Sequence, residues 1–205
     1  MFDRFISGNR KSKEAGSEAD SSDLILRLSK GDTAAIEELY NLYFDRIYSM
    51  VYNRVGRNHD NAEEVVQEIW LAVIKSAKKF KGKSSPYTWI CSIAAHKITD
   101  YQRRSYRDNA MVHKPSTNPE IPELQLIDSN PLPEELIEKK ETKEVVRMAL
   151  DSLPSHYQQV LTLKYIEELS AKEVGQVLGK SKKSVESLLD RAKLALRNEI
   201  VDMSR

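Results

Sequence analysis

The chain has 205 residues, of which 31% are charged, yet its formal net charge is only +1. Glycine and proline are few, so the composition predicts a charged, helix-rich protein with one or two domains. No apolar run is long enough to span a bilayer, the first residues lack a secretory apolar core, and the single cysteine, Cys91, excludes an internal disulfide and a cysteine-based zinc site. We therefore expect a cytoplasmic protein that does not insert into a membrane, with Cys91 as a buried, inert thiol.

The near-neutral total conceals three blocks of different charge. Residues 23–107 hold 14 basic and 10 acidic side chains, residues 108–138 hold one lysine against seven acids, and residues 139–205 hold 13 basic and 10 acidic side chains. Five of the seven prolines fall within residues 115–133, and proline at this density disfavours helix. We therefore expect a disordered tail at 1–22, a first domain at 23–107, an acidic, proline-rich linker at 108–132 and a second domain at 133–205.

In the first block, apolar residues recur every three or four positions, which predicts four helices separated by breaks near residues 31, 56 and 82. Either Asp60 or Asn61 is expected to cap the third helix. Ser85 followed by Pro86 is a good start for the fourth, because the hydroxyl can cap and proline at the first position lacks only an unneeded N–H. That helix should run to about Arg107.

Residues 77–107 concentrate positive charge, with eight basic residues and one acidic residue. Five aromatic residues are interleaved with the charges, namely Phe80, Tyr87, Trp89, Tyr101 and Tyr106. Cations beside flat rings can hold a nucleic-acid backbone while the rings stack unpaired bases. The alternative is a helix with core aromatics on one face and solvated lysines on the other.

The second block contains the pattern of a helix-turn-helix at residues 169–196. Ser170 and Glu173 form a capping box at the start of one short helix, and Gly179 can adopt the left-handed conformation that ends it. Ser181 can cap the next helix after a very short turn. An ordinary helical hairpin would share this pattern, but the lysines at 180, 182 and 183 lie where recognition helices meet the major groove.

Other chemistry has little support in the sequence. The four histidines are scattered over two blocks and the linker, and there is no phosphate-binding glycine loop, no nucleophile with a base and no metal-ligand spacing. We therefore expect neither an enzyme nor a cofactor or metal. By its spacing alone, the acidic face of the third helix (Glu63, Glu64, Gln67 and Glu68) is an ordinary solvated surface.

Three stretches together resemble one family: NAEEVVQEIWLAV (61–73), FKGKSSPYTWICSIAAHKITDYQRR (80–104) and LPSHYQQVLTLKYIEELSAKEVGQVLGKSKKSVESLLDRAKLAL (153–196). They look like bacterial RNA polymerase sigma factors of the sigma-70 family, of the small extracytoplasmic-function (ECF) kind, over roughly residues 23–199. The resemblance implies an all-α fold with a four-helix region-two domain and a region-four helix-turn-helix domain. It also implies a role in transcription initiation, often in a stress response, with core RNA polymerase, promoter DNA and an anti-sigma factor, often membrane-anchored, as partners.

The resemblance also implies roles for individual residues. Docking on the polymerase's clamp helices would fall to Glu64, Gln67, Glu68 and Leu71. Recognition and melting of the minus-ten element would fall to Lys81, Lys83, Ser84, Ser85, Tyr87, Trp89, His96, Lys97, Arg103 and Arg104. Binding of the minus-thirty-five element would fall to Lys180, Ser181, Lys182, Lys183, Ser184, Glu186, Arg191 and Lys193. The acidic linker would thread the RNA channel of the polymerase.

Several residues depart from the family's usual pattern. Pro86 and Tyr87 stand where an aromatic or aliphatic residue and an arginine are common, and Gly175 stands where alanine is usual. Cations are frequent at the positions of Glu186, Leu188 and Asp190, although Glu186 could instead accept from a cytosine amino group. Two other functions stay open from the sequence: a free-standing helix-turn-helix regulator, and an interaction protein that binds polymerase or a sigma-like partner without DNA.

Overall fold

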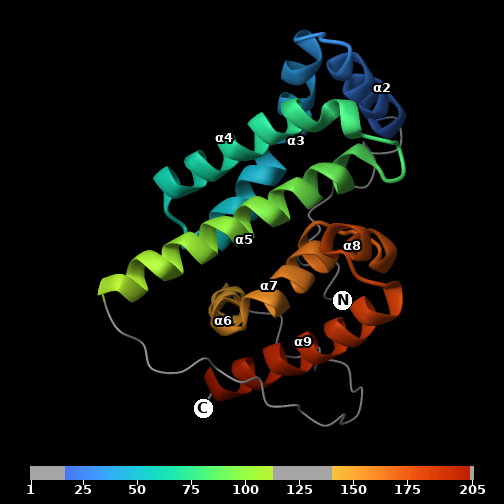
Figure 1. Cartoon of the computed structure of the whole chain (residues 1–205). Helices are drawn as coiled ribbons and strands as arrows, with labels where there is room; N and C mark the ends of the chain where they lie inside the picture. Colours follow the sequence, from blue (N-terminus) through green and yellow to red (C-terminus); the bar gives the residue numbers. More distant parts are fainter. Residues whose placement is uncertain (1–16, 113–139, 204–205) are drawn as a thin grey trace.

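Helices form all the regular structure in the computed structural model, which describes residues 17–112 and 140–203. The first part contains α2 (Ser17–Ser29), α3 (Ala34–Arg54), α4 (His59–Ser76), the 3₁₀ turn η1 (Ala77–Lys79) and α5 (Pro86–Val112). The second contains α6 (Lys140–Ser152), α7 (Ser155–Leu161), the π-helical turn η3 (Thr162–Ile166), α8 (Ala171–Leu178) and α9 (Lys182–Met203). Figure 1 shows α2–α4 on one side of the long α5 and α6–α9 on the other. The all-α prediction is confirmed.

Two helices extend beyond their predicted ends. Helix α2 begins at Ser17, so residues 17–22 are helical and the expectation of disorder there is wrong. Helix α5 continues to Val112, five residues past the predicted end, because the first proline that could interrupt it is Pro115. The rest of the predicted tail and nearly all of the predicted linker lie outside the described residues.

The caps show where local sequence reasoning succeeds. Asn58, not Asp60 or Asn61, caps α4, because Asn58 has the extended backbone of a capping residue and its side chain accepts from the Asn61 amide at 2.9 Å. The Ser85 hydroxyl caps α5 as predicted and accepts from the Thr88 amide at 3.1 Å. The capping box of Ser170 and Glu173 is also present at α8.

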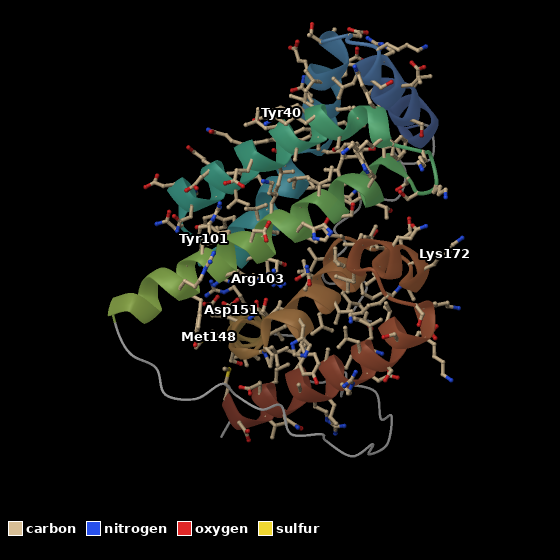
Figure 2. All side chains as sticks on the ribbon, in the orientation of Figure 1. Tyr40, Tyr101, Arg103, Met148, Asp151 and Lys172 are labelled. Atoms are coloured by element: carbon tan, nitrogen blue, oxygen red, sulfur yellow. The ribbon has the colours of Figure 1, made fainter. Side chains whose placement is uncertain are left out.

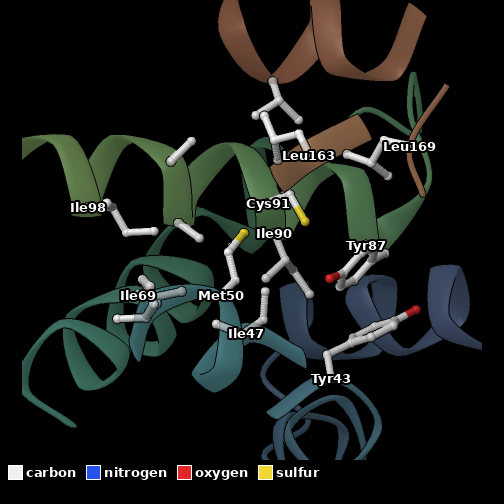
Figure 3. Packing of buried hydrophobic residues seen from close by; sticks show 14 of the residues in the cluster. Tyr43, Ile47, Met50, Ile69, Tyr87, Ile90, Cys91, Ile98, Leu163 and Leu169 are labelled. Carbon is white, nitrogen blue, oxygen red and sulfur yellow. The ribbon is translucent and has the colours of Figure 1, made fainter. Parts of the chain in front are cut away.

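The core of the first part lies where α3, α4 and α5 meet. Ile47, Ile69 and Ile90 come from these three helices and are completely buried (Figure 3). Cys91 is fully buried as predicted, and burial raises the pKa of its thiol. On the opposite side of α5, Figure 3 shows Leu163 and Leu169 from the second part packing near Cys91. Helix α5 therefore contributes to the core of its own domain and to the contact with the other domain.

The second part forms a small core around α9. Val160 of α7, Val174 of α8 and Val185 of α9 are completely buried there. The π-helical turn η3 adds a residue to the helical path after α7, and the Glu167 amide donates to the Thr162 carbonyl at its end. This turn leaves the Glu167 carboxylate buried, with only 4% of the side chain exposed. Within the ranges described, no helix has the length and apolarity needed to cross a membrane.

Candidate nucleic-acid interface

The basic loop before α5 presents its charges to solvent. Lys81 and Lys83 are exposed, whereas Ser84 and Ser85 are half-buried at the start of the helix. The Ser85 and Thr88 hydroxyls are also hydrogen-bonded to each other at 2.9 Å, so the loop joins the helix in a defined geometry. Trp89 is half-buried with its ring centroid 5.1 Å from that of Phe80. The exposed lysines of this loop can therefore reach a phosphate backbone.

Tyr87 occupies a different environment from the one expected of a base-stacking residue. Its side chain is 5% exposed and its hydroxyl donates a hydrogen bond to the Glu167 carboxylate of the second part. The Arg46 guanidinium lies 3.8 Å from the centroid of its ring, and the Tyr43 ring is 5.2 Å away on the same side of α5 (Figure 3). Burial raises the pKa of the Tyr87 phenol well above its usual value. In this arrangement the ring is not accessible to DNA.

The contact around Tyr87 is part of a larger interface between the two parts. The Thr88 hydroxyl donates to Glu173 at 3.0 Å, so the capping box of α8 is tied to α5. Arg57 pairs with Asp151 at 2.6 Å, and Figure 2 shows Arg103 and Asp151 in the region where α5 approaches α6. A cavity of about 10 Å³, room for about one water molecule, lies in the same interface. The two parts are thus closely packed against each other.

Arg54 is the most deeply buried cation of this interface. Only 8% of the residue is exposed, and its guanidinium donates to the backbone oxygen and hydroxyl of Ser155 at 3.1 and 2.9 Å. Its Nε has no hydrogen-bond partner among the described residues. Burial lowers the pKa of Arg54 to about 10. A buried cation without a carboxylate partner raises the free energy of the packed arrangement.

The acidic face of α4 carries the residues that resemble polymerase contacts. Glu64, Gln67 and Leu71 are exposed, with 54% of Leu71 accessible. Glu68 is half-buried and accepts from Lys97 at 3.0 Å and from Arg104 at 3.1 Å. The hydrogen bond from Lys97, followed by that from Arg104, holds the pKa of the Glu68 carboxyl below its usual value. Lys97 and Arg104, which are predicted to contact DNA, are therefore paired with Glu68, which is predicted to contact polymerase.

The remaining predicted minus-ten residues, His96 and Arg103, are exposed on α5. Together with the exposed loop lysines they leave a basic surface accessible even in the packed arrangement. Among the described residues, no group of three His, Cys, Asp or Glu side chains could hold a metal ion.

The second part contains the predicted helix-turn-helix in α8 and α9. Gly179 has φ 64° and ends α8 in the left-handed conformation, and the Ser181 hydroxyl accepts from the Ser184 amide at 3.2 Å. Gly175 makes the sharp turn possible, because a Cβ added there would lie 2.6 Å from the carbonyl oxygen of Lys180. Glycine at position 175, where the family usually has alanine, therefore avoids a steric clash with the Lys180 backbone.

The start of α9 forms the second basic surface. Among its predicted DNA contacts, Lys193 is half-buried. The others are exposed, namely Lys180, Ser181, Lys182, Lys183, Ser184, Glu186 and Arg191. Lys182 pairs with Glu186 at 3.5 Å and Lys193 with Asp190 at 3.5 Å. Leu188, one of the departures from the usual pattern, is buried in the domain core and so contacts no base. The cations of this surface are thus partly neutralised by its own acids.

Sequence reasoning missed the residues that join the two parts. Arg46, Arg54 and Glu167 have no role in any of the predicted sites, yet all three lie in the interface. Glu167 lies 80 residues from Tyr87 and 121 from Arg46. The one local signal in the sequence is that Glu167 lies within the mostly apolar stretch 160–169, and this does not reveal its partner.

The arrangement of the helices is similar to that in two solved structures. CnrH, whose structure was determined in complex with the cytosolic domain of CnrY, matches 90% of this chain and 99% of its own with a TM-score of 0.62 and 20% identity. The sigma factor RpoE of Bartonella quintana, solved with the anti-sigma factor NepR, matches 82% of this chain and 98% of its own with a TM-score of 0.57 and 16% identity. At these identities the likeness establishes the fold alone.

Sequence comparison then identifies the family. The Sigma-70 region 2 family matches residues 39–108, and the Sigma-70, region 4 family matches residues 143–196, which together cover more than half of the chain. The ECF RNA polymerase sigma factor SigW of Bacillus subtilis is 28% identical over 180 residues, 87% of this chain and 96% of that protein. The ECF RNA polymerase sigma-E factor of Escherichia coli K12 is 26% identical over 188 residues, 89% and 95% of the two chains. The chain belongs to the ECF sigma factors of the sigma-70 family.

Proposed function

We propose that this protein is the specificity subunit of RNA polymerase for a defined set of promoters. It would dock on the core enzyme through the exposed face of α4, bind and open the minus-ten element through α5 and the loop before it, and bind the minus-thirty-five element through α9. The observation that supports this most directly is the presence of two separate basic surfaces, each within the part of the chain that matches the corresponding sigma region. The protein would have no catalytic activity of its own and would act in the cytoplasm, where the polymerase works.

The packed arrangement adds a requirement to this function. By resemblance to the family, the loop at residues 81–88 would capture an unpaired base, and two of its residues, Tyr87 and Thr88, are buried against the second part. Base capture by this segment therefore requires the region-four domain to move away from α5. The parts that would separate are the proposed domains at 23–107 and 133–205, and the helices described for these two parts lie within residues 17–112 and 140–203.

An anti-sigma factor is the second proposed partner. Two solved relatives, CnrH and the Bartonella RpoE, were determined with CnrY and the anti-sigma factor NepR, respectively. By analogy, a protein of this kind, which can be membrane-anchored, would keep the present chain away from polymerase. The acidic segment between the domains would enter the RNA channel once the polymerase is bound, where its negative charge would imitate a transcript.

Transcription in vitro tests the proposal. Core polymerase with the purified protein should initiate at a subset of a promoter library, while neither component alone should do so. The free protein should bind such promoters weakly and gain specificity with the core enzyme. Tight, specific binding to a palindromic duplex without polymerase would instead show a free-standing helix-turn-helix regulator, since free regulators usually bind as symmetric dimers. Association with polymerase that never directs initiation would show an interaction protein.

A further inference from the structure

Glu68 is bound by cations from the neighbouring helix. Its Oε2 lies 3.0 Å from the Lys97 ammonium, and its Oε1 lies 3.1 Å from a terminal nitrogen of Arg104. Each carboxylate oxygen therefore accepts from a different cation. Glu64, one turn earlier on α4, lies 4.0 Å from the same nitrogen of Arg104 and adds a weaker attraction.

The helical geometry makes this cluster a fixed feature of the domain. Lys97 and Arg104 are seven residues apart, so they lie two turns apart on one face of α5. That face is turned toward α4, which packs along α5. Ile69, the residue after Glu68, is completely buried in the core, so packing holds the Glu68 backbone in place. The carboxylate consequently lies within reach of both cations whenever the domain is folded.

The cluster is also weak enough to exchange partners. The Glu68 side chain is 26% exposed, and those of Lys97 and Arg104 are 32% and 44% exposed. Ion pairs with this degree of exposure are screened by water and salt and contribute little to stability. A competing phosphate or a competing cation can therefore displace either member of a pair.

Glu68 also lies beside the exposed Gln67 and Leu71 on the face of α4 that the proposed function assigns to polymerase docking. A carboxylate there accepts hydrogen bonds only, so the docked partner would bring a cationic or N–H donor group to it. A third positive group at Glu68 would be repelled by Lys97 and Arg104. Docking would therefore favour release of the two cations from the carboxylate.

We propose that Glu68 couples polymerase docking to DNA binding by holding Lys97 and Arg104 in the free protein and releasing them to DNA phosphates when polymerase occupies its carboxylate. This inference rests on the proposed function. It makes Glu68 a residue that restrains DNA binding in the free protein, in addition to its role as a polymerase contact.

The test compares two charge-neutralising variants of the full chain. Glu68→Gln removes the charge that holds both cations, while Glu63→Gln makes the same change of net charge on an exposed residue of the same helix. The probe is a fluorescent single-stranded oligonucleotide that carries the minus-ten sequence of a promoter transcribed by the wild-type holoenzyme. Without polymerase and at low salt, Glu68→Gln should bind this probe about three- to tenfold more tightly than the wild type, and Glu63→Gln less than twofold more tightly.

Further measurements separate the possible results. With Lys97→Met and Arg104→Met present, Glu68→Gln should give no gain, because the cations that it releases are gone. At saturating core polymerase, wild type and Glu68→Gln should bind the probe equally, although Glu68→Gln should need more polymerase to reach saturation. Glu68→Ser provides a second variant if Glu68→Gln is poorly folded by circular dichroism, and the same gain is expected.

Three outcomes would overturn the coupling: an unchanged or weaker affinity of Glu68→Gln, an equal gain in Glu63→Gln, or a gain that survives removal of both cations. Each of these is interpretable when the wild-type holoenzyme initiates transcription. Failure of the wild type to initiate at any promoter would instead count against the proposed function itself.

Discussion

The hydroxyl of Tyr87 donates a hydrogen bond to the carboxylate of Glu167, which lies 80 residues further along the chain. Arg46 completes this contact, with its guanidinium over the Tyr87 ring and its Nε 3.7 Å from the same carboxylate. The side chain proposed to capture an unpaired promoter base is thus part of the contact between the two domains. Under the proposed function, opening of the protein and opening of the promoter would therefore depend on the same residue.

Tyr87→Phe should separate these two roles. Phenylalanine keeps the ring but loses the hydrogen bond to a buried carboxylate, which should lower the free energy of unfolding by about 1–3 kcal/mol. The domains should also separate more often, because the lost bond lies between them. Fluorescence energy transfer between dyes at Lys75→Cys and Lys172→Cys should report this as a lower efficiency. Both positions are exposed, Figure 2 shows Lys172 on the outer side of α8, and the buried Cys91 should not react with the dyes.

Tyr87→Ala provides the contrast, since it removes the ring as well as the bond. Stacking of an aromatic ring on a base is worth about 1–3 kcal/mol, so Tyr87→Ala should slow open-complex formation while Tyr87→Phe should not. A pre-opened template should rescue Tyr87→Ala only in part. If Tyr87→Ala lowers the melting temperature by several degrees and opens promoters at the normal rate, Tyr87 has only a structural role.

The stability of the protein should fall at high pH in a way that depends on Tyr87. Burial raises the pKa of this phenol in the folded protein, so the unfolded chain loses the proton first, near pH 10. The protonated Tyr87 phenol therefore contributes fully to the free energy of unfolding below about pH 10, and this contribution is lost as the pH rises through and above that value. Urea unfolding of the wild type between pH 8 and 11 should give a steeper decline than that of Tyr87→Phe. Parallel curves would show that the buried phenol is not the group that titrates.

Gly175→Ala should damage the helix-turn-helix. The added Cβ would lie 2.6 Å from the Lys180 carbonyl oxygen, and a backbone atom cannot move aside without shifting the turn. We expect a loss of about 1–3 kcal/mol in unfolding free energy and weaker binding to the minus-thirty-five element. Lys172→Ala, at an exposed position of the same helix, should leave thermal stability unchanged. A stable Gly175→Ala protein with normal binding would show that the turn can relax.

The lysines at the start of α9 should act on phosphates. Lys182→Ala and Lys183→Ala should weaken promoter binding for all sequences and flatten its salt dependence by roughly one unit per lost contact. Since Lys182 pairs with Glu186 at 3.5 Å, Glu186→Gln should free this cation and tighten non-specific binding. A changed sequence preference with an unaltered salt slope would show that the lysines read bases.

Much of this protein could be predicted from the sequence because the interactions involved are local. The apolar spacing identified the helices, and the capping box of Ser170 and Glu173, together with Gly179, identified the turn of the helix-turn-helix. These features depend on residues within one or two helical turns of each other. The basic surfaces at the loop before α5 and at the start of α9 could likewise be assigned from charge and position.

The relationships between distant residues were decided only by the tertiary structure. Two helix ends differ from the prediction by a few residues: α4 is capped by Asn58, and α5 continues to Val112. Helix ends depend on small differences in free energy, which the sequence pattern does not resolve. The pairing of Tyr87 with Glu167, and of Glu68 with Lys97 and Arg104, depends on how helices pack. Composition describes Tyr87 equally well as a base-stacking residue and as a buried one. Packing of η3 against α5 brings the Glu167 carboxylate to the Tyr87 hydroxyl. Because of this contact, the Tyr87 ring is buried in the free protein and is not available to stack on a base.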